Sequence, residues 1–128
     1  MHKILVVDDD LEIVKILEEL LTKKGFDVVT TVGGAKALEI IHSDVFDTLD
    51  LIVLDMKMPG LNGTDILKEL KRIKSQIPFI ILTGAIDAQK QKDELEKLGC
   101  SLDDVNYKPI DLFQFLNMVK KKLSRESK

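Results

Sequence analysis

The sequence predicts an α/β fold in which five β-strands alternate with five helices. Two patterns in the 128-residue chain support this prediction. Short, uninterrupted runs of Ile, Leu and Val, bounded by turn residues, are typical of strands that are buried on both faces of a parallel sheet. Longer segments between these runs carry apolar residues at the spacing of an amphipathic helix. Right-handed crossovers between parallel strands then predict a three-layer sandwich, with helices on both faces of one sheet.

The strands are expected where apolar and β-branched residues cluster between turn signals. Their predicted ranges are Ile4–Val7, Phe26–Thr31, Asp50–Leu54, Phe79–Leu82 and Val105–Tyr107. The first, third and fourth of these are the most apolar, as central strands should be. Five such strand–helix units favour the flavodoxin-like strand order 2-1-3-4-5.

The helices are bounded by capping residues and glycines. Asp10 is a suitable N-cap for the first helix and Asp111 for the last. The fourth helix, from Asp87 to Leu98, is polar and weakly amphipathic. The apolar positions of the other helices are Ile13, Ile16, Leu17, Leu20 and Leu21, then Ala37, Leu38 and Ile41, then Ile66, Leu67, Leu70 and Ile73, and, as the buried side of the last helix, Leu112, Phe113, Phe115, Leu116, Val119 and Leu123. The basic run 120–122 is most simply explained by the dipole at a helix C-terminus.

Length and composition indicate one domain, assigned to residues 1–124, with a C-terminal tail at 125–128. Lys and Arg number 19 and Asp and Glu 22, which gives a net charge of −3. A mildly acidic domain without a basic stripe is a poor candidate for direct binding to nucleic acid. No apolar stretch approaches the roughly 20 residues that cross a bilayer, so no membrane contact is expected. The single Cys100 excludes an internal disulfide and fits the cytoplasm; its simplest role is that of a small buried residue.

Polar residues follow the predicted strands at their carboxyl ends. Asp8 and Asp9 follow the first strand, Asp55 the third, Thr83 the fourth and Lys108 the fifth. Because these ends share one edge of a parallel sheet, we expect the side chains to meet there. Clustered carboxylates repel one another unless a cation intervenes, and a small set of oxygen ligands suits Mg²⁺. A threonine hydroxyl and a lysine ammonium opposite an aspartate are also suited to phosphoryl transfer onto that carboxylate.

These motifs resemble the receiver domain of two-component response regulators, the CheY-like superfamily. The resemblance rests on Asp8-Asp9, Asp55 with Met58-Pro59-Gly60, Thr83-Gly84 and Lys108-Pro109, and it extends from Lys3 to about Leu123. It implies that Asp55 accepts a phosphoryl group from a histidine kinase, a histidine phosphotransfer protein or a small phosphodonor. The domain would then change conformation to control a protein partner or an output domain, as a monomer or a phosphorylation-dependent homodimer. Since this is self-catalysed phosphotransfer, we do not class the chain as an enzyme.

The resemblance also implies a role for each residue of the motif. Asp9 and Asp55 would bind Mg²⁺ directly, together with the backbone carbonyl of Lys57, while Asp8 would act through water. Thr83 and Lys108 would hold phosphoryl oxygens. A cis peptide bond is expected between Lys108 and the proline that follows it.

The chain departs from the family at two places. The family often has an aromatic residue three positions before the conserved lysine, where this chain has Val105, and its nearest aromatic is Tyr107. The stretch Gly99–Lys108 is also about two residues longer than is usual in the family. The conformational switch is therefore expected to differ. We further expect Lys57 and Ala85 to influence how long the phosphoryl group persists, by controlling the placement of attacking water.

Three other functions use similar features. An electron carrier with this fold needs a Ser/Thr/Gly loop for the FMN phosphate, and the acidic run 8–10 would repel that phosphate. A haloacid-dehalogenase-type phosphatase expects a second acid two residues after its nucleophile, where this chain has Lys57. A pseudo-receiver, acting as a phosphorylation-independent interaction module, normally lacks one of the motif residues. It is the most serious alternative.

Overall fold

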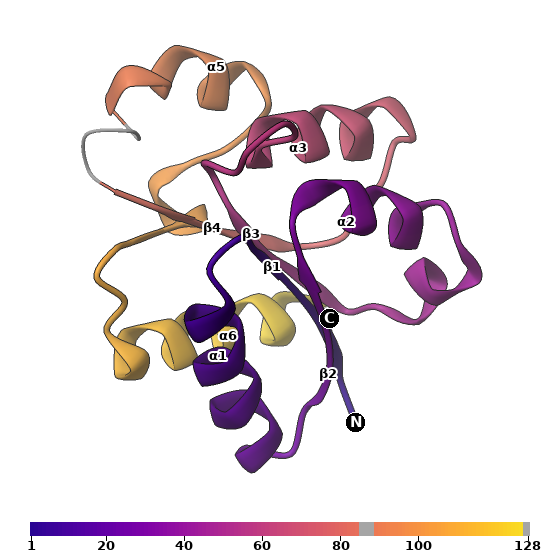
Figure 1. Ribbon diagram of the computed structural model, residues 1–128, viewed down its shortest axis with the longest axis vertical. Helices are drawn as coiled ribbons and strands as arrows, with labels where there is room; N and C mark the ends of the chain where they lie inside the picture. The colour runs from indigo at the N-terminus through magenta and orange to yellow at the C-terminus, as the bar shows by residue number, and fades with distance from the viewer. Residues whose placement is uncertain (85–88, 127–128) are drawn as a thin grey trace.

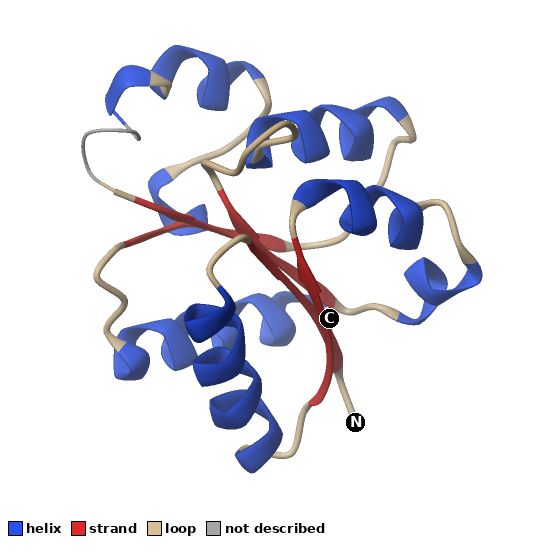
Figure 2. Cartoon of the chain, viewed as in Figure 1, coloured by secondary structure: helices blue, strands red, loops and turns tan. Residues whose placement is uncertain are grey.

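The computed structural model describes residues 1–84 and 89–126. One sheet of five parallel strands runs through the molecule in the order β2-β1-β3-β4-β5 (Figures 1 and 2). The strands are β1 (Lys3–Asp8), β2 (Asp27–Val32), β3 (Leu51–Asp55), β4 (Phe79–Thr83) and β5 (Val105–Tyr107). This confirms the predicted fold class and strand order, and each strand bound lies within one residue of the prediction.

Helices cover both faces of the sheet. One face carries α1 (Leu11–Lys23) and α6 (Leu112–Glu126), and the other carries α2 (Gly34–Ile41), α3 (Gly63–Arg72) and α5 (Lys92–Lys97) (Figure 1). Two short 3₁₀ helices, η1 (Asp44–Thr48) and η2 (Leu102–Asp104), precede β3 and β5. The expected start of the fourth helix, at Asp87, lies outside the described residues. The described helices contain none that is long and apolar enough to cross a membrane.

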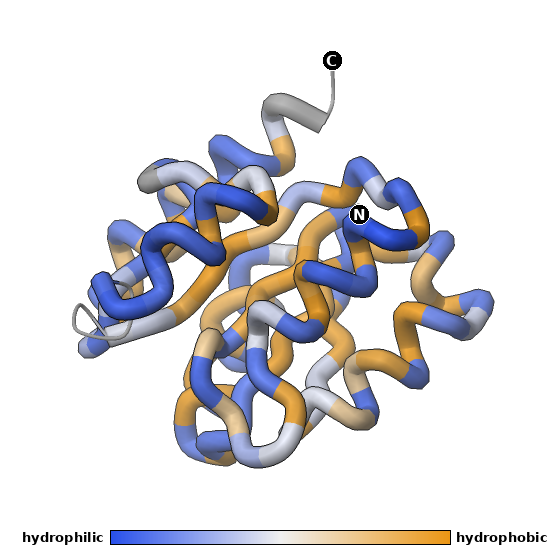
Figure 3. Tube along the Cα trace, turned by 90° about the horizontal axis from the view of Figure 1, so that it is seen from above, coloured by the Kyte–Doolittle hydropathy of each residue, from blue (hydrophilic) through white to orange (hydrophobic). Residues whose placement is uncertain are grey.

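Alternate residues of the central strands belong to different cores. In β1, Leu5 and Val7 pack toward α2 and α3, whereas Ile4 and Val6 pack toward α1 and α6. All four are fully buried, as the apolar run predicts for a strand covered on both faces. Figure 3 shows hydrophobic stretches of the chain running through the interior, between segments with many hydrophilic residues. Two of the three strands that are buried along almost their whole length, β1 and β3, end in aspartates.

The buried side of α6 was predicted wrongly at its first two residues. Leu112 is 40% exposed and Phe113 is 75% exposed. Leu112 stands four residues before the buried Leu116 and so lies on the buried stripe, but in the first turn of the helix. Phe113 is about 100° further round the helix and is turned away from that stripe. Similarly, in α1 the core receives Val14 rather than the half-exposed Ile16.

The prediction for the basic run 120–122 is wrong for its last member. Lys122 is 7% exposed; its ammonium forms an ion pair with Asp104 and lies 5.8 Å from the ring centroid of Phe79. A lysine can be covered in this way when its stem packs on apolar groups and its charge meets an acid. Cys100, in contrast, is buried as predicted.

Candidate functional site

The sheet brings three carboxylates together at one edge. β1 ends at Asp8 and β3 ends at Asp55, and these strands are neighbours in the sheet. Asp8 is fully buried, Asp55 is 3% exposed and Asp9, just beyond β1, is exposed. One carboxylate oxygen from each of the three lies within 4.8 Å of the other two. The predicted convergence of the strand ends therefore holds for all three acids.

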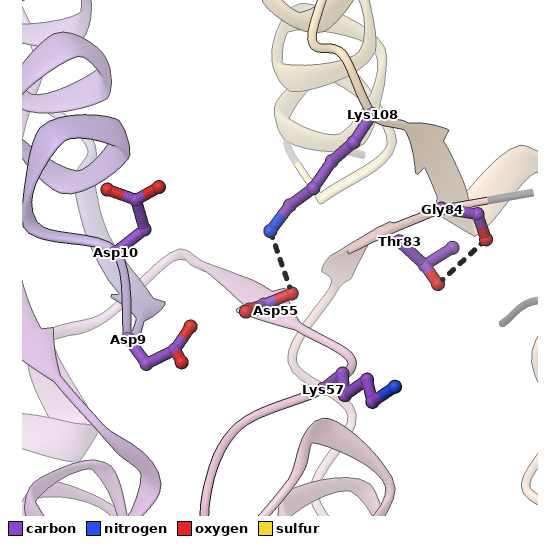
Figure 4. A pocket seen from close by; sticks show the side chains of 7 residues that line it. All are labelled: Asp9, Asp10, Asp55, Lys57, Thr83, Gly84 and Lys108. Atoms are coloured by element: carbon purple, nitrogen blue, oxygen red, sulfur yellow. Dashed lines mark hydrogen bonds and ion pairs between the residues drawn. The ribbon is translucent and has the colours of Figure 1, made fainter.

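Lys108 extends from the end of β5 toward these acids (Figure 4). Its Nζ donates a hydrogen bond to Oδ1 of Asp55 at 3.1 Å and lies 3.4 Å from Oδ2 of Asp8. The backbone N–H of Lys108 donates to the carbonyl of Thr83 at 2.8 Å, which fixes the base of the side chain to β4. The peptide bond between Lys108 and Pro109 is cis, as predicted.

Thr83 and Lys57 lie at the same edge of the sheet. Thr83 is 2% exposed, and its hydroxyl donates to the carbonyl of Gly84 at 3.2 Å. Lys57 is exposed, and in Figure 4 its side chain points away from Asp55. Ala85 lies outside the described residues. An open hollow of about 320 Å³ lies at this edge of the sheet. It is lined by Asp9, Asp10, Asp55, Lys57, Thr83, Gly84 and Lys108.

The acidic residue next in the chain, Asp10, has a structural role as well as a place in the hollow. Its Oδ1 accepts a hydrogen bond from the backbone N–H of Glu12 at 2.9 Å, so it caps α1 as predicted. Its own backbone N–H donates to Oδ1 of Asp8 at 2.9 Å. The start of α1 thereby holds the buried carboxylate of Asp8 in place.

The electrostatic environment of Asp55 disfavours its charged form. Burial, followed by the negative charge of Asp8, raises the pKa of Asp55 from 3.8 to about 7, against the opposing effect of Lys108. Burial lowers the pKa of Lys108, but its hydrogen bond to Asp55 and the charges of both acids outweigh this, and the pKa is raised overall. Lys108 therefore stays charged, whereas Asp55 titrates near neutral pH.

The turn after β3 depends on a glycine that the sequence did not single out as part of the site. Gly63, the first residue of α3, donates its N–H to the carbonyl of Met56 at 2.8 Å. A Cβ at Gly63 would lie 2.6 Å from the carbonyl oxygen of Asp55 and 3.0 Å from Cα of Met56. The capping box of Asn62 and Asp65 fixes the start of the helix in this position. The only sequence signal for this close approach is a glycine directly after a helix N-cap.

The donor atoms at this edge fit a small divalent cation. Among the described residues, Oδ2 of Asp8 is buried without a hydrogen-bond partner, and its ion pair with Lys108 is long. A buried, unsatisfied carboxylate oxygen and a carboxyl with a raised pKa are both stabilised by added positive charge. Clustered carboxylate oxygens are also the ligands that hard cations prefer. Asp8, Asp9 and Asp55 are the residues that could hold such an ion.

Comparison with known proteins decides the family. The sequence-family model of the response regulator receiver domain matches residues 4–120 of this chain. The chain belongs to the response regulator receiver domain family. Receiver domains of this family serve two-component signalling, interact with histidine kinases and typically bind Mg²⁺ at an acidic pocket. The electron-carrier and phosphatase alternatives are thereby set aside.

Several relatives of this receiver domain are similar over all or nearly all of its length. It is 35% identical, over 128 residues, to response regulator SaeR of Staphylococcus aureus, and covers 53% of that protein. The chain thus spans about half the length of the curated relatives it matches. Solved receiver domains from Clostridium thermocellum and Francisella are each 29% identical, with TM-scores of 0.86 and 0.84. The match to the Clostridium domain covers 99% of this chain and 98% of that one. The match to the Francisella domain covers 98% of this chain and 99% of that one.

Proposed function

We propose that this receiver domain accepts a phosphoryl group on Asp55 in a Mg²⁺-dependent reaction. The donor would be a phosphohistidine on a histidine kinase or on a histidine phosphotransfer protein. The phosphorylated domain would then switch conformation to control a protein partner or an output domain. The observation that carries the proposal is the ammonium of Lys108, which lies 3.1 Å from Asp55 at an edge where two further carboxylates converge.

The chain's own residues suggest the course of the reaction. An ionised oxygen of Asp55 attacks phosphorus, a P–O bond forms, and the P–N bond of the phosphohistidine breaks, so that the imidazole leaves with the electron pair of that bond. Lys108, already at the attacking carboxylate, would turn its ammonium to a phosphoryl oxygen. The hydroxyl of Thr83 would leave the carbonyl of Gly84 and donate its hydrogen bond to a second phosphoryl oxygen. Both movements place donors where negative charge gathers.

Asp8, Asp9 and Asp55, with the backbone carbonyl of Lys57, are the residues that would hold Mg²⁺. The ion, when bound, supplies positive charge that neutralises the carboxylates and the phosphoryl oxygens. The raised pKa of Asp55 supports this assignment, because without added positive charge the nucleophile is partly protonated at neutral pH. The unsatisfied Oδ2 of Asp8 supports it independently.

The pseudo-receiver alternative differs in its site rather than in its fold. Such a module normally lacks an acid, the threonine or the lysine, and this chain retains them all.

We also propose the domain range 1–124 with a tail at 125–128, a cytoplasmic location, and a monomer or phosphorylation-dependent homodimer. We expect no direct contact with nucleic acid or membrane.

Labelling by a small phosphodonor tests the proposal. With phosphoramidate or acetyl phosphate and Mg²⁺, the native chain should gain one phosphoryl group, measured by mass spectrometry of the intact protein. Asp55→Asn should abolish the label, whereas Asp47→Asn, at an exposed acid in η1, should leave it unchanged. Label that persists in a folded Asp55→Asn variant would move the acceptor elsewhere. A native chain that takes no label, alone or from a kinase, would favour the pseudo-receiver.

A further inference from the structure

Lys122 places a positive charge in the largely apolar interface between α6 and the sheet. Val119 and Leu123, its neighbours on the inner face of α6, belong to the core between α6 and the sheet. The ammonium of Lys122 pairs with Asp104, and it lies above the ring of Phe79, at the start of β4. A charge removed from water is stabilised only while its partner stays in place. Any movement of Asp104 must therefore be followed by Lys122 or break the ion pair.

The partner, Asp104, is the residue that directly precedes β5. Its other carboxylate oxygen accepts a hydrogen bond from the backbone N–H of Ser101 at 2.8 Å. Two residues later, the side-chain amide of Asn106 donates to the sulfur of Met118 at 3.2 Å. Met118 is one helical turn before Lys122, so two successive polar contacts join β5 to α6 along one line.

The far end of β5 reaches the acidic pocket. β5 has three residues and pairs with β4 at the edge of the sheet, and Lys108 follows its last residue. Lys108 contacts Asp55, while Asp104, four residues earlier, contacts Lys122. A short edge strand has fewer backbone bonds to break than a central one, so it is the strand most able to shift as a unit.

We propose that β5 and the ion pair of Lys122 with Asp104 transmit the state of Asp55 to the C-terminal end of α6. The inference rests on the proposed function, because it requires a ligand on Asp55 to which Lys108 turns. When Lys108 leaves the carboxylate for that ligand, β5 is drawn toward the pocket and carries Asp104 with it. Lys122 then follows its partner or loses it, and the last turns of α6 shift in either case. This route does not use an aromatic residue at the position of Val105.

Amide chemical shifts of the whole chain can test this route, with beryllofluoride and Mg²⁺ as the phosphoryl mimic. In the native chain, addition of the mimic should shift the amides of Lys108 and of residues 119–124. Lys122→Met keeps a long apolar side chain and removes the charge. In this variant the shift at Lys108 should persist, while the shifts at 119–124 should fall severalfold. Lys121→Met, at the adjacent exposed lysine, is the matched control and should behave like the native chain.

Reciprocity gives a second measurement. If α6 and the pocket are coupled, breaking the ion pair must also change the affinity of the pocket for the mimic, by about fivefold or more for coupling of typical size. Should Lys122→Met not fold, the double variant Lys122→Met/Asp104→Asn leaves neither charge without its partner and serves instead.

The possible outcomes separate the link from the proposed function. The proposed link between β5 and α6 would be overturned if a folded Lys122→Met variant showed shifts at 119–124 as large as those of the native chain and an unchanged affinity for the mimic. A native chain in which Lys108 responds and residues 119–124 do not would also overturn it. A native chain in which neither Asp55 nor Lys108 responds to the mimic would instead contradict the proposed function.

Discussion

The ammonium of Lys108 lies 3.1 Å from Oδ1 of Asp55 and joins the edge strand of the sheet to the central one. Burial and the nearby charge of Asp8 disfavour the ionised form of Asp55, and Lys108 is the group that opposes both effects. The same ammonium is close to Asp8, at 3.4 Å. The ionisation of Asp55 therefore depends on Lys108, which directly follows β5, the strand with the fewest paired residues.

Removal of this ammonium should raise the pKa of Asp55 further. Lys108→Met leaves the burial and the charge of Asp8 in place but removes the hydrogen bond and the charge that lower the pKa. We expect a value clearly above the native one of about 7, measured by ¹³C NMR of the Asp55 carboxyl group without Mg²⁺. Lys121→Met is the control, since Lys121 is an exposed lysine of α6 outside the residues that line the hollow. An unchanged or lower pKa in Lys108→Met would contradict the assignment.

The raised pKa of Asp55 should make the metal-free domain less stable at alkaline pH. The folded-state pKa, about 7, exceeds the ordinary aspartate pKa of 3.8, so the folded state binds more protons between these two pH values. Stability contributed by protonated Asp55 is thus complete below about pH 4 and lost as pH rises through 7. In EDTA at pH 8, Asp55→Asn should be more stable than the native chain by on the order of 2–4 kcal/mol.

Urea unfolding at pH 5 and pH 8 measures this difference. The advantage of Asp55→Asn should be smaller at pH 5, where native Asp55 is mostly protonated. Saturating Mg²⁺ at pH 8 should stabilise the native chain by about 2.7 kcal/mol at a hundredfold excess over the dissociation constant. An advantage of Asp55→Asn that does not grow between pH 5 and pH 8 would show that burial of Asp55 does not control its ionisation.

Gly63→Ala should disturb the acceptor through its main chain. The added methyl group would lie 2.6 Å from the carbonyl oxygen of Asp55, so β3 and α3 must separate. We expect a loss of about 1–3 kcal/mol in the free energy of unfolding, together with slower labelling by phosphoramidate. Gly34→Ala is the steric control, because its methyl group would meet the carbonyl oxygen of Leu61 at 2.7 Å instead. Equal labelling rates in the two variants would assign the effect to stability alone.

Lys57→Asn tests whether Lys57 affects the lifetime of the phosphoryl group. Lys57 is exposed at the mouth of the hollow, and a shorter side chain would leave more room for water. We expect the dephosphorylation half-life to shorten by up to about tenfold, equivalent to about 1.4 kcal/mol of activation free energy. The rate is measured after removal of the phosphodonor. An unchanged half-life, with stability unchanged, would remove Lys57 from this role.

The sequence was sufficient for the sheet and for the position of the site. Runs such as Ile4–Val7 can be read directly because a strand buried on both faces has no polar position, and parallel strands leave no choice about which ends meet. Asp8, Asp9, Asp55 and Lys108 therefore come together as predicted. The chemical roles assigned to these residues stay predictions.

The remaining features depend on where one element ends against another, which periodicity does not encode. Apolar spacing shows which side of a helix is apolar, but not that the first turn of α6 leaves Phe113 exposed. Lys122 belongs to a basic run, and only the position of Asp104 shows that it is buried. The contact of Gly63 with the main chain of Asp55 depends on the path of the intervening loop.

The central strands β1 and β3 and the edge strand β5 should also differ in how fast their amide hydrogens exchange with solvent. The interior residues of β1 and β3 are fully buried, so amide hydrogens such as those of Val53 and Leu54 should exchange with solvent only when the whole domain unfolds. The amides of β5, at the edge, should exchange through a smaller and more frequent opening. A modification on Asp55 would then be retained through many openings of the strand that responds to it. The amides of β3, which carries Asp55, and those of β5, which precedes Lys108, should then exchange on different timescales because they belong to different cooperative units of the same sheet.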